Sequence, residues 1–300
     1  MRIAFVYDSI FPYVNGGIER RNYEFAARLT RKGHEVHIFG PKYWNGPDVI
    51  MQEGTYLHGI CTPGNRFNDG KRSILAPIYF ALRLFFPLVR GKFDIIDCPI
   101  FPYFPAYTSR LVSLIRRTPL VIQWFEIWDT FWKEYLGWKG IFGRLIERFT
   151  VRLPHRIVVE TDETRCSLVS WGFNPEYITN IPSGCDTKFY STVTPTKVIE
   201  DASDVIFTGR LVDYKRVDLI LSAVRVLHEQ GIDIKAGIIG DGPEMAQLVT
   251  QASEDGITAN VKFHGFIETA EDTVSIMKAS KMFVYAAAPL GGWALTPIEA

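Results

Sequence analysis

The sequence predicts an α/β protein made of two domains, each built on a doubly wound parallel sheet. Three observations support this fold class. The chain has 300 residues, of which 47% are hydrophobic, and this is enough for two cores. Short apolar runs alternate with helical patterns, as expected where helices connect parallel strands. Several runs end in loops rich in glycine or charge, and open α/β sheets bind ligands at this carboxyl edge.

The first domain is expected to cover residues 1–186. It begins with an apolar strand at residues 3–7, a loop that ends in Gly16 and Gly17, and a helix that closes at Gly33. Further short apolar runs predict strands at residues 35–39, 57–60, 93–97, 120–124, 156–159 and 177–181. Helical patterns lie between them at residues 74–89, 103–115, 140–153 and 162–171.

The second domain is expected at residues 204–300, after a linker at 187–203 that has few apolar residues. Its strands are predicted at residues 205–207, 235–239, 261–263 and 282–285, and its helices at 217–227, 244–252 and 270–278. A last helix is expected to begin near residues 295–297, shortly before the sequence stops. We therefore expect this domain to be truncated and the chain to be a fragment of a longer protein.

The composition excludes some classes of function. With 33 basic and 33 acidic residues the net charge is zero, which argues against a nucleic-acid-binding protein. The cysteines are far apart and lack metal-ligand spacing, so we interpret them as reduced thiols. The first apolar run is too short for a signal peptide, and residues 74–89 are too short and too interrupted to span a bilayer. The sequence therefore indicates a cytoplasmic protein.

The segment 204–215 is the strongest candidate for a binding site. An apolar strand reaches Gly209, which permits a sharp exit, and the loop then presents Arg210 and Lys215 before the next helix. Two cations at the carboxyl edge of a parallel sheet would suit a phosphorylated ligand. The alternative is that both are ordinary solvated charges of a loop.

Other loops add to this prediction. Gly16-Gly17, Gly240-Asp241-Gly242-Pro243 and Gly291-Gly292 also follow predicted strands, and we expect them to face one cleft between the domains. Arg210, Lys215 and the helix N-terminus after Gly292 would neutralise a diphosphate. No acidic cluster suits magnesium, so the site is expected to need neither a metal nor a cofactor.

An aromatic stretch runs from Trp124 to Trp138, and a basic helical segment follows it with Lys139, Arg144, Arg148 and Arg152. Aromatic rings stack on sugars and lie well at a lipid interface, and basic residues attract anionic headgroups. The stretch therefore suggests an acceptor site or a peripheral contact with the inner membrane face. The alternative is that the aromatics are core and the arginines a solvated helix face.

Several motifs together resemble retaining glycosyltransferases of the GT-B fold, family 4, over essentially the whole chain. They are Gly16-Gly17-Ile18-Glu19, Ile181-Pro182-Ser183-Gly184-Cys185-Asp186, Gly209-Arg210-Leu211 with Lys215-Arg216-Val217-Asp218, Gly240-Asp241-Gly242-Pro243 and Leu295-Thr296-Pro297-Ile298-Glu299-Ala300. The resemblance implies two Rossmann-like domains that face a cleft. It also implies transfer of a sugar from a nucleoside-diphosphate sugar to a lipid-linked or saccharide acceptor.

The resemblance assigns roles to particular residues. Arg210 and Lys215 are expected to be catalytic by stabilising the diphosphate, Glu299 to bind the ribose hydroxyls, and Gly17 to lie near the phosphate and the sugar. The remaining donor-binding residues are expected to be Gly16, Gly209, Phe266, Gly292, Leu295 and Thr296. No metal is implied.

The sequence departs from the family pattern at two positions. Phe125 stands where the family usually has a sugar-contacting histidine, and Gly291 stands where it has the first of two glutamates, the second being Glu299. Glu126 and Trp124 are candidates for sugar or acceptor contacts in their place. A sugar-nucleotide-binding domain without transferase activity, or another GT-B enzyme such as an epimerase, therefore stays as an alternative.

Overall fold

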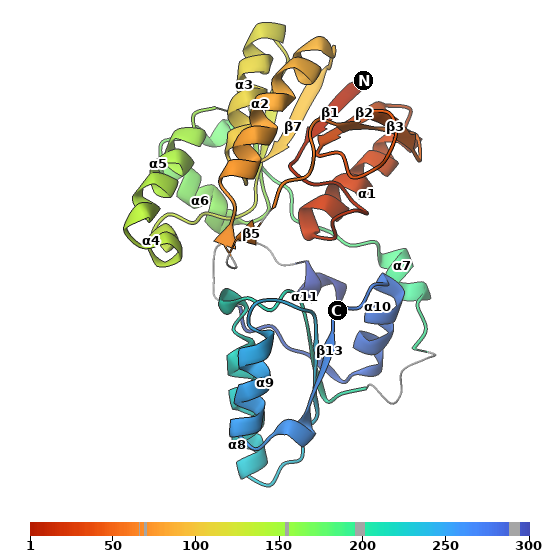
Figure 1. Ribbon diagram of the computed structural model, residues 1–300, viewed down its shortest axis with the longest axis vertical. Coiled ribbons are helices and arrows are strands. Elements are labelled where there is room, and N and C mark those ends of the chain that lie inside the picture. The colour runs from red at the N-terminus through yellow and green to blue at the C-terminus, as the bar shows by residue number, and fades with distance from the viewer. Residues whose placement is uncertain (66, 69–70, 154–155, 196–201, 288–294) are drawn as a thin grey trace. The chain divides into compact units, whose positions relative to one another are not determined.

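The computed structural model describes residues 1–300 except 66, 69–70, 154–155, 196–201 and 288–294 (Figure 1). The described residues form two compact units. The first covers Met1–Pro182, and the second begins at Ser183. None of the helices that the structure describes is long and apolar enough to cross a membrane.

The first unit is built on a sheet with the strand order β10-β9-β8-β7-β1-β2-β4-β3. All neighbouring strands run parallel except β3, which pairs antiparallel with β4 at the sheet edge. The strands are β1 (Arg2–Val6), β2 (Glu35–Gly40), β3 (Val49–Gln52), β4 (Thr55–Gly59), β7 (Ile95–Pro99), β8 (Leu120–Trp124), β9 (Arg156–Val159) and β10 (Ile178–Asn180). A small separate hairpin pairs β5 (Phe67–Asn68) with β6 (Lys71–Arg72).

Helices cover both faces of this sheet. They are α1 (Gly17–Arg31), α2 (Leu75–Arg90), α3 (Phe104–Arg116), α4 (Phe131–Leu136), α5 (Gly140–Thr150) and α6 (Asp162–Ser170), with short 3-10 turns η1 (Gly137–Lys139) and η2 (Pro175–Tyr177). Helices α2 and α3 lie side by side (Figure 1), and the Thr108 hydroxyl donates a 2.9 Å hydrogen bond to the Ala81 carbonyl between them. Thr161 caps α6 by accepting from the Thr164 N–H.

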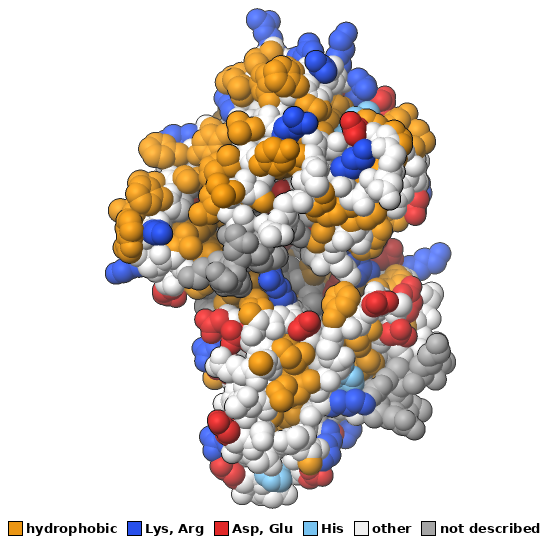
Figure 2. Space-filling view, viewed as in Figure 1, with side chains coloured by type: hydrophobic (Ala, Val, Ile, Leu, Met, Phe, Trp, Pro, Cys, Tyr) orange, Lys and Arg blue, Asp and Glu red, His pale blue; other side chains and the backbone are white. Residues whose placement is uncertain are grey.

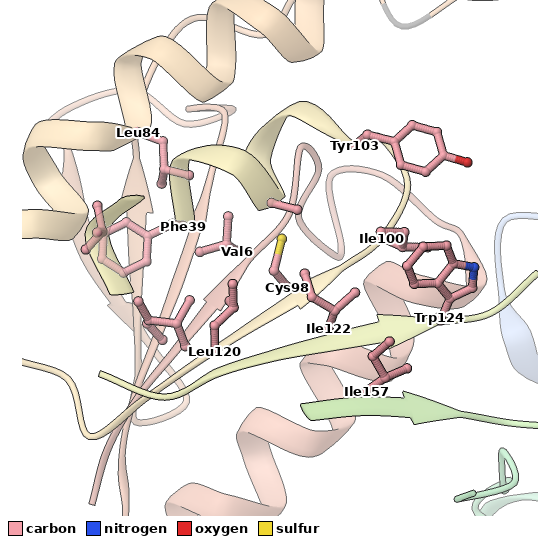
Figure 3. Packing of buried hydrophobic residues seen from close by; sticks show 14 of the residues in the cluster. Val6, Phe39, Leu84, Cys98, Ile100, Tyr103, Leu120, Ile122, Trp124 and Ile157 are labelled. Carbon is pink, nitrogen blue, oxygen red and sulfur yellow. The ribbon is translucent and has the colours of Figure 1, made fainter. Parts of the chain in front are cut away.

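The cores of the first unit lie on the two faces of its sheet. On one face Trp124, Ile122 and Ile157 pack with Ile100 under the helices (Figure 3). On the other face α1 contributes Ala26 to a smaller cluster that contains Ile3, Phe5, Val36, Ile38 and Leu57. Because each fully buried aliphatic side chain contributes roughly 1.5–3 kcal/mol, these two clusters hold the sheet and its edge loops in place.

The second unit has a parallel sheet with the order β13-β12-β11-β14. Its strands are β11 (Val205–Thr208), β12 (Ala236–Ile239), β13 (Val261–Gly265) and β14 (Met282–Phe283). Its helices are α7 (Thr187–Thr192), α8 (Val217–Glu229), α9 (Met245–Glu254), α10 (Ala270–Ala279) and α11 (Thr296–Glu299), with 3-10 turns η4 (Asp213–Lys215) and η5 (Thr258–Asn260). The apolar stripes of α8 and α9 pack with Phe207 and Ile238 in one core.

The predicted alternation of strands and helices is confirmed in both units, and each predicted strand and helix is present with small shifts at its ends. Several elements were missed, among them the hairpin of β5 and β6. Strand β3 was not predicted because its turn into β4 is Glu53-Gly54, with φ of 50° and 80°, and glutamate is not a usual signal for such a turn. Helix α4 lies in the aromatic stretch, and α7 lies in the predicted linker, where Asp186 caps it by accepting from the Phe189 N–H.

Candidate functional site

Glycine loops form the carboxyl edge of the second sheet. Gly209 follows β11 with φ 155°, and Gly240 follows β12 with φ 133°. The Gly209 N–H donates to the Ile239 carbonyl and the Gly240 N–H to the Gly265 carbonyl, so the three loops are bonded to one another. A Cβ atom on Gly240 would lie 1.9 Å from the Gly209 carbonyl oxygen. This edge therefore consists of closely packed backbone. Because the glycines have no side chains, a ligand can approach that backbone directly.

The two predicted cations lie on the loop that leaves Gly209. Arg210 is exposed, and Lys215 lies in η4, directly before α8. The Lys215 ammonium donates a hydrogen bond to the Tyr285 hydroxyl and lies 4.8 Å from the centre of the same ring. Tyr285 follows β14, so Lys215 is tied to the neighbouring strand end. The structure thus places both cations at one sheet edge, as the sequence predicted.

Phe266 lies at the same edge, directly after β13. Its side chain is 61% exposed, and it follows Gly265, whose φ is 69°. A base or a sugar can stack on an exposed aromatic ring such as this one.

The remaining predicted donor residues lie on and beside α11. Leu295 precedes the helix, Thr296 begins it and Glu299 ends it. Glu299 lines a cavity of about 320 Å³ together with Tyr190, Ser191, Lys278 and Lys281, and neither Arg210 nor Lys215 is among its described lining residues. The structure therefore does not bring Glu299 and the two cations to one cavity. Gly292, as well as Gly291, lies outside the described residues.

The glycine pair of the first unit lies at the N-terminus of α1, where Gly16 is the residue before the helix and Gly17 begins it. The Glu19 carboxylate folds back over Gly16, since a Cβ atom there would lie 2.4 Å from Glu19 Oε2. The buried Glu19 also accepts a 2.6 Å hydrogen bond from the Ser9 hydroxyl. The helix thus already has its own anion at its positive end.

Trp124, Phe125 and Glu126, at the end of β8 and directly after it, differ from one another in burial and contacts. Trp124 is fully buried in the core, as Figure 3 shows, and this burial argues against its stacking on a sugar. Glu126 is partly buried and accepts a 2.7 Å hydrogen bond from the Trp128 indole N–H. Phe125 is partly exposed, and the Arg21 guanidinium lies 5.6 Å from the centre of its ring.

Most of the aromatic stretch is core, which is the alternative that the sequence left open. Trp128 and Trp132 are buried, whereas Trp138 is 76% exposed. These rings surround Glu147 of α5, whose carboxylate accepts from the Trp128 and Asp129 N–H groups at 2.9 Å and from the Trp132 indole at 3.1 Å. Burial raises the pKa of Glu147 to about 7, although these hydrogen bonds oppose the shift.

The sequence analysis missed a polar cluster at the carboxyl edge of the first sheet. Its members are Arg21 and Asn22 of α1, Asp97 of β7, Gln123 of β8 and Glu160, which follows β9. The Gln123 amide donates a 2.7 Å hydrogen bond to Asp97. Burial lowers the pKa of the Arg21 guanidinium, and the charges of Asp97 and Glu160 oppose this shift. Polar residues inside or directly after buried parallel strands were the signal that could have identified it.

Among the residues that the structure describes, no group of three or more His, Cys, Asp or Glu side chains is arranged to hold a metal ion. That the protein needs no metal stays a prediction from the sequence.

Solved structures with the same fold are numerous. The HepE protein of Anabaena, in complex with UDP-glucose, has a TM-score of 0.72 and 19% identity, over 100% of this chain and 77% of that one. Sucrose-phosphate synthase of Thermosynechococcus elongatus has a TM-score of 0.77 and 14% identity, over 99% and 78%. The catalytic domain of starch synthase IV of Arabidopsis thaliana, bound to ADP and acarbose, has a TM-score of 0.68 and 15% identity, over 99% and 80%. No curated protein matches the sequence significantly.

Family models account for nearly all of the sequence. The model of Glycosyltransferase Family 4 matches residues 15–189, and the model of glycosyl transferases group 1 matches residues 194–300. Together with the two parallel sheets and the GT-B architecture of the similar structures, these matches lead to one conclusion. The chain belongs to Glycosyltransferase Family 4.

Proposed function

We propose that this glycosyltransferase is a retaining, metal-independent enzyme that transfers a hexose-type sugar from a nucleoside diphosphate to a lipid-linked or saccharide acceptor. The observation that carries the proposal is the glycine-built edge of the second sheet, which presents Arg210 and Lys215 on one loop. Similar solved structures hold UDP-glucose, UDP or ADP, which supports a nucleotide-sugar donor.

Charge stabilisation is the main chemical contribution of this edge. In the proposed reaction the acceptor hydroxyl forms a bond to the anomeric carbon from the face that the diphosphate leaves, and its proton passes to a phosphate oxygen. Negative charge grows on the diphosphate as the carbon–oxygen bond breaks, and Arg210 and Lys215 stabilise it. One such preorganised donor contributes roughly 3–4 kcal/mol to the stabilisation of a transition state.

The rest of the donor is assigned from the same unit. We propose that Phe266 stacks on the base and that Glu299 accepts hydrogen bonds from the ribose hydroxyls. Because Gly209 has no side chain, the phosphates can approach the backbone at this position. Leu295 and Thr296, at the start of α11, are proposed further contacts of the donor. Gly16, Gly17 and Glu126 are proposed contacts of the sugar or the acceptor in the first unit.

The test is turnover with a panel of nucleotide sugars. The full chain is incubated with UDP-glucose, UDP-galactose, ADP-glucose and GDP-mannose, with and without lipid and saccharide acceptors, and release of nucleoside diphosphate is measured. NMR of the product's anomeric configuration tests retention, and an unchanged rate in EDTA tests metal independence. Binding without release in every condition would favour the alternative of a sugar-nucleotide-binding domain, which Phe125 and Gly291 motivate.

A hydrophobic and basic surface of the first unit supports a membrane-borne acceptor. Figure 2 shows hydrophobic side chains gathered over α2, α3 and α5. Exposed side chains of these three helices include Leu75, Tyr79, Leu82, Phe86, Leu111, Leu114, Ile115, Ile141, Phe142, Leu145 and Phe149. On α5 they alternate with exposed Arg144 and Arg148. We propose that this apolar-basic surface lies on an anionic leaflet at the inner membrane face, because apolar and basic side chains on one helix favour such an interface.

A further inference from the structure

The polar cluster of the first sheet is organised around Arg21. Strands β9, β8 and β7 are neighbours, so their carboxyl ends bring Glu160, Gln123 and Asp97 to one place, and α1 brings Arg21 to the same edge. Gln123 and Glu160 are buried, whereas the Arg21 side chain is partly exposed. The cluster is therefore a partly open site with a buried polar base.

Arg21 is held between two aromatic rings. Its guanidinium lies 4.3 Å from the centre of the Phe25 ring and 5.6 Å from that of Phe125. A guanidinium has five N–H donors, and the hydrogen bond that the described residues give it goes to the Asn22 side-chain oxygen, at 3.3 Å. The two rings are close enough for cation–π contacts with the guanidinium, and donors remain for a ligand.

Two further polar atoms of the cluster have no hydrogen-bond partner within the described protein. They are the Asn22 side-chain nitrogen and Oδ1 of Asp97, and Asn22 is only 2% exposed. One is a donor and the other an acceptor. Buried polar atoms are usually paired, so these two unpartnered atoms indicate a network that a ligand or ordered water completes.

The charge of the cluster points to a neutral ligand. Arg21 faces the carboxyl groups of Asp97 and Glu160, and a single ionised carboxylate is enough to cancel its positive charge. A phosphate or carboxylate ligand would meet no net attraction here. Hydroxyl groups both donate and accept hydrogen bonds, and the apolar face of a sugar ring packs against aromatic side chains such as Phe25 and Phe125.

We propose that Arg21 binds hydroxyl groups of a neutral sugar and that Asp97 and Gln123 position it. The proposal rests on the proposed function, since the sugar belongs either to the nucleotide sugar or to the acceptor. The proposal also gives a role to Phe125, which stands where the family pattern has a histidine. Its ring contacts the guanidinium of Arg21.

The first experiment uses free sugars, so that it does not depend on turnover. Ligand-observed NMR compares binding of glucose, galactose and mannose with that of glucuronate and glucose 1-phosphate to the full chain. We expect at least one neutral sugar to bind more tightly than the anionic ones. Arg21→Gln should weaken that binding by about 10-fold, and Phe125→Leu by less. Arg31→Gln, an exposed arginine at the end of the same helix, is the matched control and should change nothing.

A second experiment separates a role in recognition from a role in folding. Glu160→Gln removes one of the two acids, and Asp97→Asn with Glu160→Gln removes both. If the acids set the charge of the site, relative affinity should shift stepwise toward glucuronate, which a purely structural role would not cause. The melting temperature of each variant is measured alongside. If Glu160→Gln is folded but prefers neutral sugars over glucuronate as strongly as the wild type does, the result would count against the proposal.

Nucleotide binding then identifies the source of the sugar. If Arg21 contacts the donor, Arg21→Gln should abolish the difference in Kd between UDP-glucose and UDP; if it contacts the acceptor, that difference stays and only free-sugar binding falls. A wild-type protein that binds no nucleotide sugar would refute the proposed function, and free-sugar binding would still decide the role of Arg21. The inference is overturned if Arg21→Gln binds every probe as the wild type does, or if the wild type binds no neutral sugar.

Discussion

The carboxyl edges of the two sheets are built in different ways. In the first unit the edge is made of side chains, with Arg21 set against Asp97 and Glu160. In the second unit it is made of glycine backbone, from which Arg210 and Lys215 extend. The first edge combines one cation with two acidic residues, whereas the second has two cations on the loop that leaves Gly209. An anion therefore gains most at the second edge, and a neutral polyol suits the first.

The same contrast holds for buried ionisable groups. The first unit contains Glu147 inside an aromatic cluster and the hydrogen-bonded pair of His37 and His58. In the second unit most shifted pKa values belong to exposed ion pairs, such as that of Asp204 with Lys281. Exposed pairs contribute little to stability. We therefore expect that side chains added at glycine positions destabilise the second unit most. Changes in pH should alter the stability of the first unit most.

The largest expected effect is that of Gly240→Ala. The new Cβ atom would overlap the Gly209 carbonyl oxygen, and φ of 133° is unfavourable for any residue but glycine. We expect a loss of more than about 3 kcal/mol in the free energy of unfolding of the second unit, measured by urea denaturation. Gly231→Ala is the control, because its φ is 78° but nothing lies within 4 Å; it should cost only about 1 kcal/mol. Equal losses would show that the loops are not closely packed in solution.

Lys215→Ala tests the cations at the edge of the second sheet. It should weaken binding of a nucleoside diphosphate by about 100-fold and binding of the nucleoside hardly at all, because the lost interaction is with the phosphates. Calorimetry with UDP and uridine, or with the base that the protein selects, measures both. Exposed Lys188→Ala in the same unit is the control. Equal losses for nucleotide and nucleoside would refute the assignment of Lys215 to the diphosphate.

The histidine pair should make the first unit acid-sensitive. His37 Nδ1 and His58 Nε2 are 2.8 Å apart, and burial lowers the pKa of His58 from 6.5 to about 4. Between these values the unfolded chain binds a proton that the folded chain does not. The contribution of His58 to stability should therefore fall by about 2 kcal/mol as the pH falls from 6.5 to 4, so His58→Phe compared with the wild type isolates it. Tryptophan fluorescence during urea unfolding reports this, since most tryptophans lie in the first unit. In His58→Phe the acid-induced loss should be smaller.

Glu147 should give stability the opposite dependence on pH. Burial raises its pKa from 4.5 to about 7, so the folded chain keeps a proton that the unfolded chain has released. The contribution of Glu147 to the stability of the first unit should therefore decrease by about 2 kcal/mol as the pH rises from 4.5 to 7, which opposes the contribution of His58. Comparing Glu147→Gln with the wild type across this range isolates the effect, because the amide does not titrate. Parallel pH profiles for the two proteins would contradict the assignment.

The smallest expected effect concerns the apolar-basic surface. Phe142→Ser combined with Phe149→Ser should weaken binding to phosphatidylglycerol vesicles by about 10-fold, because two exposed rings are lost from the interface. Vesicle flotation measures this, and phosphatidylcholine vesicles should bind less well throughout. Met51→Ser, at an equally exposed residue on β3, is the control. If the wild type does not bind anionic vesicles, the membrane contact is refuted.

Much of the fold follows from local patterns in the sequence. Apolar runs such as residues 120–124 and 156–159 became strands at the predicted positions, because a strand buried on both faces must be apolar throughout. What escaped prediction depended on rarer signals. The turn at Glu53-Gly54 places a glutamate at a φ of 50°, and α7 is a helix of only 6 residues in a segment with few apolar residues, so both appear only in the structure.

The part of the candidate site that lies on a single loop after a strand could be predicted from the sequence. Gly209 and Lys215 are neighbours in sequence, and their placement at one edge follows from the order of strand, loop and helix. The Arg21 cluster joins residues from four elements that lie far apart in the sequence. Sequence spacing contains no information about such contacts, which arise only when β9, β8 and β7 align.

The Glu19 carboxylate over Gly16 has a consequence for stoichiometry. A helix N-terminus next to a glycine pair is a common anion site, but α1 already places its own acidic side chain there. A second phosphate group would have to displace a buried carboxylate or accept its repulsion. We therefore expect each chain to take up one nucleotide, at the loops of the second sheet, and calorimetric titration with excess UDP to saturate at a single equivalent.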